Sequence, residues 1–445
     1  MVSDTWRIPS EAAIRDLLVE RIDRERSGIG IVVGVVDAEG RRVVAQGALA
    51  KGDPRSLDGA TVFEIGSITK VFTCLALADM VERGEVKLDD PAAKHLPAGV
   101  TVPERGGKQI TLIDLATHTS GLPRWPDDMA PGELSPKDWS NPYADYTAEQ
   151  LHAFLAGHRL RRDIGAGHAY SNLGMGLLAR ALAHRAGLDF ETLVRQRITG
   201  PLGMADTAMA LTPDQQARFA IGHDHARRSV AAWEMPTFAG AGALRSTADD
   251  MLTFLAAELG FIDTPLHAAM TDQLEPRRQS DAGYVQALGW RIDPEPDGEI
   301  VWHGGATGGV RCFALFDVRR RAGVVMLTNS ASERNDDIPF HLLNGRPLKP
   351  APPKRVAIAV DAEALEPLVG RYRFSATRFI VVIREDDRLF AQITGQWRFE
   401  VFPESPTTFF WLVAAARMRF EVGADGRAAG LVFSQDGRDI PAGRV

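Results

Sequence analysis

The stretch Phe63-Glu-Ile-Gly-Ser-Ile-Thr-Lys70 is the most informative part of the chain. Ser67 and Lys70 stand three residues apart at the start of a helix expected over 67–83, so their side chains share one face of that helix. The free N–H groups and the dipole of a helix N-terminus favour negative charge that develops on the serine. A desolvated lysine can accept the serine proton. Because Ser-x-x-Lys also arises by chance, the pair alone leaves a surface serine and a solvated lysine open.

Two further groups of residues extend this pattern. Tyr170-Ser-Asn172 precedes an amphipathic segment; a tyrosine can act as a general base when a cation lowers its pKa, and the Asn172 amide can donate to a substrate carbonyl. Trp302-His-Gly-Gly-Ala306 stands where one expected strand ends and the next begins. Glycines there admit a ligand or a second backbone, and a backbone N–H can stabilise an oxyanion. Taken singly, these groups are also compatible with a helix-capping tyrosine and a glycine-rich hairpin turn.

Ser-x-x-Lys, Tyr-x-Asn and His-x-Gly in this order resemble the penicillin-recognising serine hydrolases. The sequence is similar to their class C β-lactamase-like branch, which includes penicillin-binding D-Ala carboxypeptidases, D-aminopeptidases, family VIII carboxylesterases and some acyltransferases. Two other stretches also match, Thr117-His-Thr-Ser-Gly-Leu-Pro123 and Gly242-Ala-Leu-Arg-Ser-Thr247. The resemblance covers about residues 10–345, and the C-terminal block looks like the lipocalin-like barrel of some D-aminopeptidases.

The resemblance implies a role for each matching residue. Ser67 is the acylated nucleophile, Lys70 takes or buffers its proton, and Tyr170 is the general base and acid. Asn172 orients the acyl group, and the N–H groups of Ser67 and Ala306 form the oxyanion hole. His303, Gly304 and Gly305 are the remaining substrate-binding positions that the resemblance implies. The proton shared between Lys70 and Tyr170 belongs to the pair, not to either residue.

The His303-Gly304-Gly305 segment departs from the family pattern, because many members carry Lys-Thr-Gly there. The lysine and the threonine bind a substrate carboxylate, and this chain lacks both. An imidazole with an ordinary pKa of about 6.5 is mostly neutral at pH 7. We therefore expect weaker recognition of β-lactam carboxylates and more room for esters or amides. A class A enzyme is disfavoured, because its Ser-Asp-Asn and glutamate motifs are missing.

The order of expected elements predicts an α+β domain, with an antiparallel sheet flanked by helices and a helical insert. A proline-rich linker over 346–355 then separates a catalytic domain over 1–345 from an antiparallel β-barrel over 356–445. In the first domain the expected elements are a helix over 11–26 and strands over 30–36, 42–48, 286–292, 299–303, 309–316 and 322–328. A capping box is expected at Ser246-Thr-Ala-Asp249, and eight short strands are expected after residue 370.

The composition disfavours several partners. Lys+Arg 51 against Asp+Glu 58 gives a net charge of −7, which disfavours nucleic acid and anionic membranes. No apolar stretch approaches the ~18–20 residues that span a membrane. No signal peptide is recognisable, so the chain as written is expected to be cytoplasmic, or periplasmic or secreted if it is a trimmed form. The oligomeric state stays open, and we expect no metal and no organic cofactor.

Several other patterns are expected to be structural. His223-Asp-His225 lacks a third metal ligand and is expected in a solvated loop. Gly174-x-Gly-x-x-Ala179 follows no strand, so nucleotide binding is disfavoured. His118 is expected to be a structural loop residue. Tryptophans of the insert can either line a substrate pocket or pack in the core, namely Trp125, Trp139 and Trp233.

The expected function is a two-step serine acyl hydrolase that acts through a Ser67 acyl-enzyme on a small-molecule or peptide substrate. Amides or peptides with D-amino acids are the favoured substrates, because barrel-bearing members of the family act on them. The alternatives are a carboxylesterase, an acyltransferase or peptide cyclase that uses the same acyl-enzyme, and a non-catalytic scaffold. The barrel is expected either to cap the active site or to mediate oligomerisation.

Overall fold

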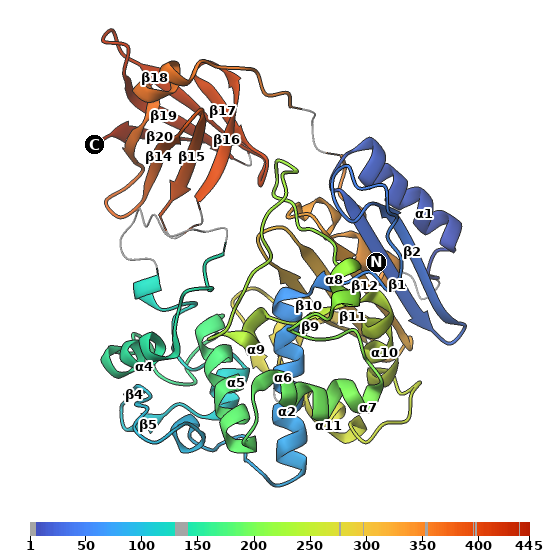
Figure 1. Ribbon diagram of the computed structural model, residues 1–445. Coiled ribbons are helices and arrows are strands. Elements are labelled where there is room, and N and C mark those ends of the chain that lie inside the picture. The colour runs from blue at the N-terminus through green and yellow to red at the C-terminus, as the bar shows by residue number, and fades with distance from the viewer. Residues whose placement is uncertain are drawn as a thin grey trace. The chain divides into compact units, whose positions relative to one another are not determined.

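The structure is a computed structural model that describes residues 6–129, 141–275, 277–296, 298–351, 355–394, 396, 398–435 and 437–445. The described residues divide into two compact units, one that ends at Lys349 and one that runs from Pro350 to Val445 (Figure 1). Each unit has its own hydrophobic core. Trp139 lies outside the described residues.

The first unit is built on one antiparallel sheet of eight strands, which confirms the α+β prediction. Hairpin strands from the start of the chain pair with strands from the end of the unit, since β1 contacts both β2 and β12. In sheet order the strands are β2 (Gly40–Gly47), β1 (Gly30–Asp37), β12 (Ala322–Thr328), β11 (Arg311–Asp317), β10 (Gly298–Ala306), β9 (Arg291–Glu295), β8 (Val285–Gln286) and β7 (Arg278–Gln279).

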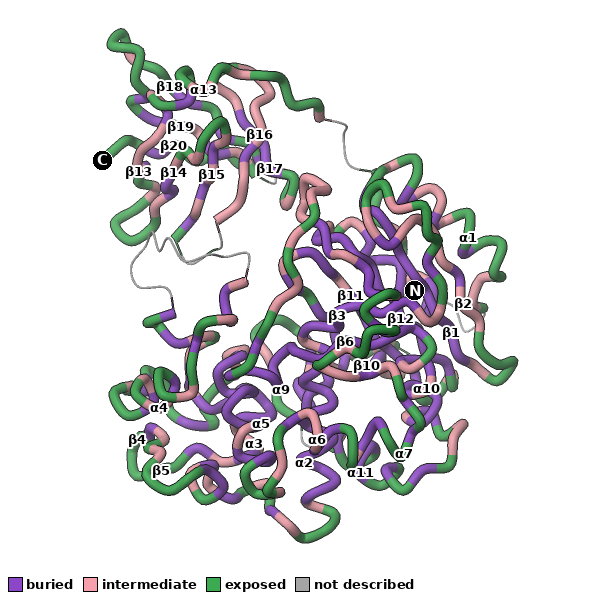
Figure 2. The backbone as a smooth tube through the Cα atoms, in the orientation of Figure 1, coloured by how far each residue is buried: buried purple, intermediate pink, exposed green. Residues whose placement is uncertain are grey.

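Both faces of the sheet are covered by helices. In β1, Val33 and Val35 face one hydrophobic cluster, with α1 (Glu11–Val19) and α12 (Ile338–Asn344). Val32 and Val36 face the other cluster, with α2 (Thr69–Glu82) and α10 (Ala248–Glu258). Burial on both faces explains why β1 is a continuous apolar run, and Figure 2 shows β1 and α2 as largely buried. The expected helix over 11–26 is α1 continued by a wider turn over Glu20–Arg24.

A helical region lies between the strands, as expected from the sequence. The largest hydrophobic cluster among the described residues includes side chains of α2 and of α5 (Asn172–Ala186) in this region. Its further helices are α3 (Leu112–Ala116), α4 (Ala148–Gly157), α5 (Asn172–Ala186), α6 (Phe190–Val194), α7 (Gly200–Leu202), α8 (Pro213–Ala217), α9 (Ala239–Gly242) and α11 (His267–Asp272).

The structure corrects two local predictions. The single strand expected over 286–292 is broken into β8 and β9, because the chain turns at Gly289, where φ is +76°. A Cβ at Gly289 would lie 2.8 Å from the carbonyl oxygen of Lys70, so only glycine fits this close approach. The cap of α10 is Thr247, which accepts from the Asp250 N–H, and not the expected Ser246.

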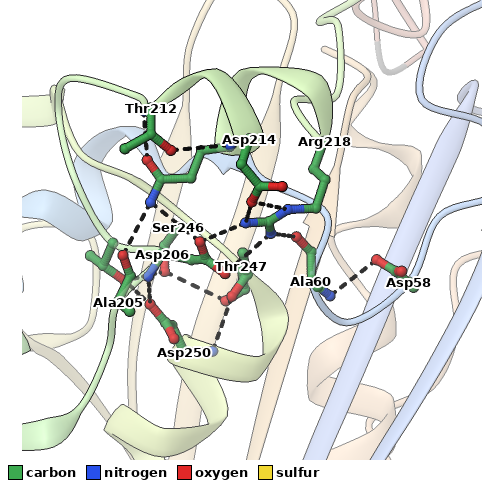
Figure 3. Close-up of polar contacts among 12 residues, drawn as sticks. Asp58, Ala60, Ala205, Asp206, Thr212, Asp214, Arg218, Ser246, Thr247 and Asp250 are labelled. Carbon is green, nitrogen blue, oxygen red and sulfur yellow. Dashed lines mark hydrogen bonds and ion pairs between the residues drawn. The ribbon is translucent and has the colours of Figure 1, made fainter.

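A polar network supports β3 (Phe63–Glu64), which pairs with β6 (Arg245–Ser246). Arg218 forms ion pairs with Asp206 at 2.7 Å and with Asp214 at 2.9 Å. The same guanidinium donates to the carbonyl of Ala60 (Figure 3). The Arg218 carbonyl in turn accepts from the Val62 N–H at 3.0 Å. The network therefore holds the chain just ahead of β3.

The second unit is a closed antiparallel barrel of eight strands, as the turn spacing predicts. β13 pairs with β20, so the sheet has no free edge along this closure. Buried aromatic and aliphatic side chains fill the core, among them Tyr372, Phe409 and Met418. The strands are β13 (Gly370–Arg373), β14 (Phe379–Glu385), β15 (Arg388–Ile393), β16 (Arg398–Ser405), β17 (Thr408–Trp411), β18 (Ala416–Val422), β19 (Ala428–Gln435) and β20 (Arg438–Arg444).

Candidate active site

Ser67 lies in the 3-10 turn Gly66–Ile68 that joins β3 to α2. The Ser67 side chain is partly exposed, whereas Lys70 in the first turn of α2 is fully buried. The Lys70 Nζ atom donates to Ser67 Oγ at 2.9 Å and to the carbonyl of Ala241 at 2.5 Å. The i, i+3 spacing thus brings the two side chains together as predicted.

Tyr170 reaches the same oxygen from the segment just ahead of α5. Its hydroxyl donates to Ser67 Oγ at 2.9 Å, and Lys70 Nζ lies 5.0 Å from the centre of its ring. Two side chains from distant segments, Lys70 and Tyr170, therefore converge on the hydroxyl oxygen of Ser67. A nucleophile with two titratable neighbours within hydrogen-bond distance is the geometry that covalent acyl transfer requires.

The environment lowers the pKa values of both Lys70 and Tyr170. Burial lowers the pKa of Lys70, and Arg124 and Arg291 lower it further, although Tyr170 opposes them. Burial acts to raise the pKa of Tyr170, but the charges of Lys70 and Arg291 outweigh burial, so the pKa falls below its ordinary value. A lysine that releases its proton more easily and a tyrosine that ionises more easily can exchange a proton through Ser67.

Strand β10 approaches the Ser67 turn backbone to backbone. A Cβ at Gly66 would lie 2.8 Å from the Ala306 nitrogen, and a Cβ at Gly305 would lie 2.0 Å from the Ile65 carbonyl oxygen. Gly305 thus serves the close approach of a second backbone, whereas a Cβ at Gly304 would lie 3.0 Å from the ring of Phe313. The approach places the Ala306 backbone next to the Ser67 turn.

His303 is buried within β10 and is neutral. Its Nδ1–H donates to the carbonyl of Gly304 at 2.8 Å, since a carbonyl oxygen can only accept. Burial lowers the pKa of His303 well below its ordinary value, and Arg291 and Lys70 lower it further. The imidazole therefore provides no permanent charge at this position, as expected from the sequence.

Asn172, the first residue of α5, lies beside Tyr143. Its Nδ2 donates to the Tyr143 hydroxyl at 2.9 Å, and its buried Oδ1 has no hydrogen-bond partner among the described residues. Burial raises the pKa of Tyr143 to about 12. The Asn172 amide is thus held by the Tyr143 hydroxyl through one N–H.

Two arginines that the sequence motifs did not indicate flank Tyr170. The guanidinium carbons of Arg291 and Arg124 lie 5.4 Å and 5.3 Å from the centre of its ring. Neither arginine forms an ion pair within the part of the chain that the structure describes, and the buried Nε of Arg291 has no hydrogen-bond partner there. Arg291 pairs across the sheet with Trp302, next to His303. Arg291 therefore brings a positive charge close to Tyr170 from the strand that pairs with β10.

Comparison with known proteins agrees with this geometry. Residues 15–343 match the family model described as beta-lactamase. The chain belongs to the beta-lactamase family. Residues 354–442, which include the barrel, match a second model described as a domain of unknown function (DUF3471). The protein is thus a β-lactamase family serine hydrolase with an eight-stranded C-terminal barrel.

The names of the curated relatives of this β-lactamase family member describe carboxypeptidase, endopeptidase or penicillin-binding activity. The chain is 29% identical over 343 residues to the D-alanyl-D-alanine-carboxypeptidase/endopeptidase AmpH of Escherichia coli (strain K12), which covers 72% of this chain and 85% of the relative. It is 26% identical over 419 residues to penicillin-binding protein 4* of Bacillus subtilis. This match covers 88% of this chain and 90% of the relative. A solved β-lactamase/D-alanine carboxypeptidase from Yersinia pestis superposes with a TM-score of 0.63 at 27% identity, over 74% of this chain and 97% of that chain.

Glu64 is a buried carboxylate beside the nucleophile turn of this β-lactamase family member. It accepts from the Trp233 N–H at 2.8 Å and from the Thr307 hydroxyl at 3.1 Å. Burial raises the pKa of Glu64 to about 7, although these bonds and Arg245 oppose the shift. Since Thr307 follows Ala306 directly, Glu64 ties the end of β10 to the segment that leads into the nucleophile.

The other candidate patterns of the sequence have structural positions in this β-lactamase family member. His223 is buried and accepts from the Lys51 N–H at 3.1 Å, so the expectation of a solvated loop is wrong. Metal-binding clusters are absent from the described residues.

Trp125 is partly buried and packs near Arg124, and Trp233 packs against Tyr143. Among the helices of the described segments, none is long and apolar enough to cross a membrane.

Proposed function

We propose that the protein is a serine acyl hydrolase that acts through a Ser67 acyl-enzyme on peptides ending in a D-amino acid, as D-Ala carboxypeptidases do. The observation that supports this most is the convergence of Lys70 Nζ and the Tyr170 hydroxyl on Ser67 Oγ, each at 2.9 Å. Such a geometry activates a serine without a metal or an organic cofactor.

In the first step, Ser67 Oγ attacks the scissile carbonyl carbon and its proton passes to the Lys70–Tyr170 pair. Negative charge then develops on the carbonyl oxygen, where the N–H groups of Ser67 and Ala306 can stabilise it. When the C–N bond breaks, Tyr170 returns the proton to the leaving amine. The amine departs with its carboxylate, and an ester bond to Ser67 remains.

In the second step, a water molecule attacks the ester carbonyl. Tyr170 takes the water proton, the acid product forms, and the proton returns to Ser67 Oγ. The cations beside Tyr170 favour its anionic form, which is the form that can act as this base. In this proposal Asn172 orients the acyl group.

Arg291 supports a substrate with a free C-terminal carboxylate. Guanidinium groups bind carboxylates with two parallel hydrogen bonds. Arg291 has an unsatisfied Nε, lacks an ion pair among the described residues, lies beside the Tyr170 ring, and lowers the pKa of His303 through its charge. We infer that Arg291 binds the terminal carboxylate in place of the family's usual lysine.

The test compares an acyl-D-Ala-D-Ala peptide with the same peptide carrying a C-terminal amide. We expect wild type to cleave the free acid at least about tenfold faster, since one charged hydrogen bond contributes about 1.5–3 kcal/mol. Arg291→Gln should abolish that preference, while Arg15→Gln on the exposed face of α1 should keep it. Equal rates on both peptides in wild type would contradict the role of Arg291, and failure of Ser67→Ala to abolish cleavage would contradict the proposed mechanism.

A carboxylesterase is the second candidate, and the neutral state of His303 favours it. An ester substrate needs no cation at this strand position. Hydrolysis of short-chain nitrophenyl esters that depends on Ser67, together with inert D-Ala-D-Ala peptides, would favour the esterase. Products in which an added amine replaces water would indicate acyl transfer by the same intermediate.

A further inference from the structure

His118 stands at an unusual backbone position. It follows the C-cap residue of α3, Thr117, and its φ is +58°. Glycine usually occupies this position, because a side chain there is strained. His118 is also buried, with 1% of its surface exposed. A strained residue in a buried position indicates that its side chain has a specific task.

His118 contacts Tyr170 and the residues on either side of it. Its carbonyl accepts from the Ala169 N–H at 2.7 Å, and its Nδ1 accepts from the Ser171 N–H at 3.2 Å. Its ring centre lies 4.6 Å from that of Tyr170, with 42° between the ring planes. His118 therefore holds the backbone on both sides of Tyr170 and packs against the phenol ring.

The hydrogen bonds also define the protonation state of His118. A backbone N–H only donates, so Nδ1 is unprotonated and the proton of the neutral ring is on Nε2. Burial lowers the pKa of His118 well below its ordinary value, and the facing groups Lys70, His168, Arg291 and His303 lower it further. The buried Nε2 has no hydrogen-bond partner among the described residues. The ring thus remains neutral and keeps its acceptor for Ser171.

We propose that His118 is the positioning residue for Tyr170: its carbonyl, its Nδ1 and its ring together hold the tyrosine hydroxyl against Ser67 and between the cations. This inference rests on the proposed function, in which Tyr170 relays the proton. Its hydrogen bonds to Ala169 and Ser171 and its ring contact with Tyr170 give His118 a role that acts through Tyr170.

Tyrosine titration gives a test that needs no substrate. The chain contains five tyrosines. The pKa values of Tyr143, Tyr146, Tyr284 and Tyr372 are all raised, mainly by burial, whereas that of Tyr170 alone is lowered. Near-ultraviolet absorbance should therefore show one early tyrosinate step, absent from Tyr170→Phe.

His118→Gly and His118→Asn form a matched pair of variants. Both residues tolerate positive φ, but only asparagine offers an acceptor near the position of Nδ1. We expect His118→Gly to raise the pKa of the early step by about one unit or more, because Tyr170 leaves the cations that lower it. His118→Asn should give an intermediate value. An unchanged early step in His118→Gly, or equal shifts in both variants, would overturn the proposal.

Kinetics give the second readout. Displacement of a catalytic group by about 1 Å can cost on the order of 100-fold in rate, so we expect a kcat loss of that order in His118→Gly and partial recovery in His118→Asn. In a Tyr170→Phe background the same substitutions should have little further effect. Independent losses in that background would overturn the proposal. If wild type shows no Ser67-dependent turnover at all, the proposed function fails, and the titration still decides the role of His118.

Discussion

Gly66 and Ala306 are in backbone contact, since a Cβ at Gly66 would lie 2.8 Å from the Ala306 nitrogen. One residue belongs to the nucleophile turn and the other to the end of β10. The contact explains why both segments carry glycine: each backbone occupies the space where a side chain of the other would be. The proposed oxyanion hole depends on this approach.

Gly305→Ala should therefore impair acylation strongly. Its Cβ would lie 2.0 Å from the Ile65 carbonyl, so β10 must move away from the turn that carries Ser67. Loss of one oxyanion donor costs about 100- to 1000-fold in kcat. Gly304→Ala is the matched control, because its Cβ would meet the side chain of Phe313 at 3.0 Å instead of backbone. Acylation rates measured with a chromogenic ester distinguish the two, and equal rates would contradict the account.

Glu64→Gln should alter the pH dependence of stability. The pKa of Glu64 is raised from 4.5 to about 7, so the folded protein holds this proton more tightly than the unfolded chain does. The bound proton of Glu64 stabilises the folded protein below pH 4.5, and this stabilisation is lost as pH rises towards 7. The free energy of unfolding of Glu64→Gln relative to wild type should therefore rise by up to about 3 kcal/mol across this range.

Denaturation at about pH 5 and about pH 8 measures this change. Glu234→Gln is the control, because Glu234 is an exposed carboxyl that contacts the same Arg245. A difference between Glu64→Gln and wild type that is the same at both pH values would show that Glu64 does not titrate in this window.

His303→Lys should increase acylation by a penicillin, by about tenfold, since it restores a cation for the β-lactam carboxylate. The gain should grow as pH falls, because burial and the nearby Arg291 favour a neutral group at this position. His303→Gln, which adds no charge, should show no gain. The absence of any gain in His303→Lys would mean that residue 303 does not face the substrate.

The two units should unfold in two transitions, because each has a separate core. Phe409→Ala removes a buried ring from the barrel and should destabilise only that unit, by about 3–5 kcal/mol. Phe254→Ala is the counterpart in the first unit. Calorimetry of both variants tests this prediction, and a single transition that shifts equally in both would contradict it.

Local spacing accounts for much of what the sequence predicts. Ser67 and Lys70 meet because three residues along a helix return to the same face. Turn residues at regular intervals predict the barrel strands, because each short strand must reverse direction. The role of Tyr170 as general base follows from the family resemblance, since nothing local specifies its long-range contact with Ser67.

Arg291 and His118 could not be assigned from local patterns. Arg291 lies on β9, which comes close to the site because β9 pairs with β10, Arg291 opposite Trp302. The single strand expected over 286–292 does not include the turn at Gly289 that separates β8 from β9. His118 stands in the stretch 117–123, which resembles the family, but only the structure shows the positive φ that strains it.

Intact-mass spectrometry of the protein during incubation with a penicillin tests the central claim most directly, with Ser67→Ala as the control. The account predicts that the protein gains the mass of the penicillin, that Ser67→Ala does not, and that the adduct decays as the acyl-enzyme is hydrolysed. Rapid loss of the drug that requires Ser67, without a lasting adduct, would have the same meaning with faster deacylation. An adduct or drug loss that persists in Ser67→Ala would contradict the assignment of Ser67 as the nucleophile.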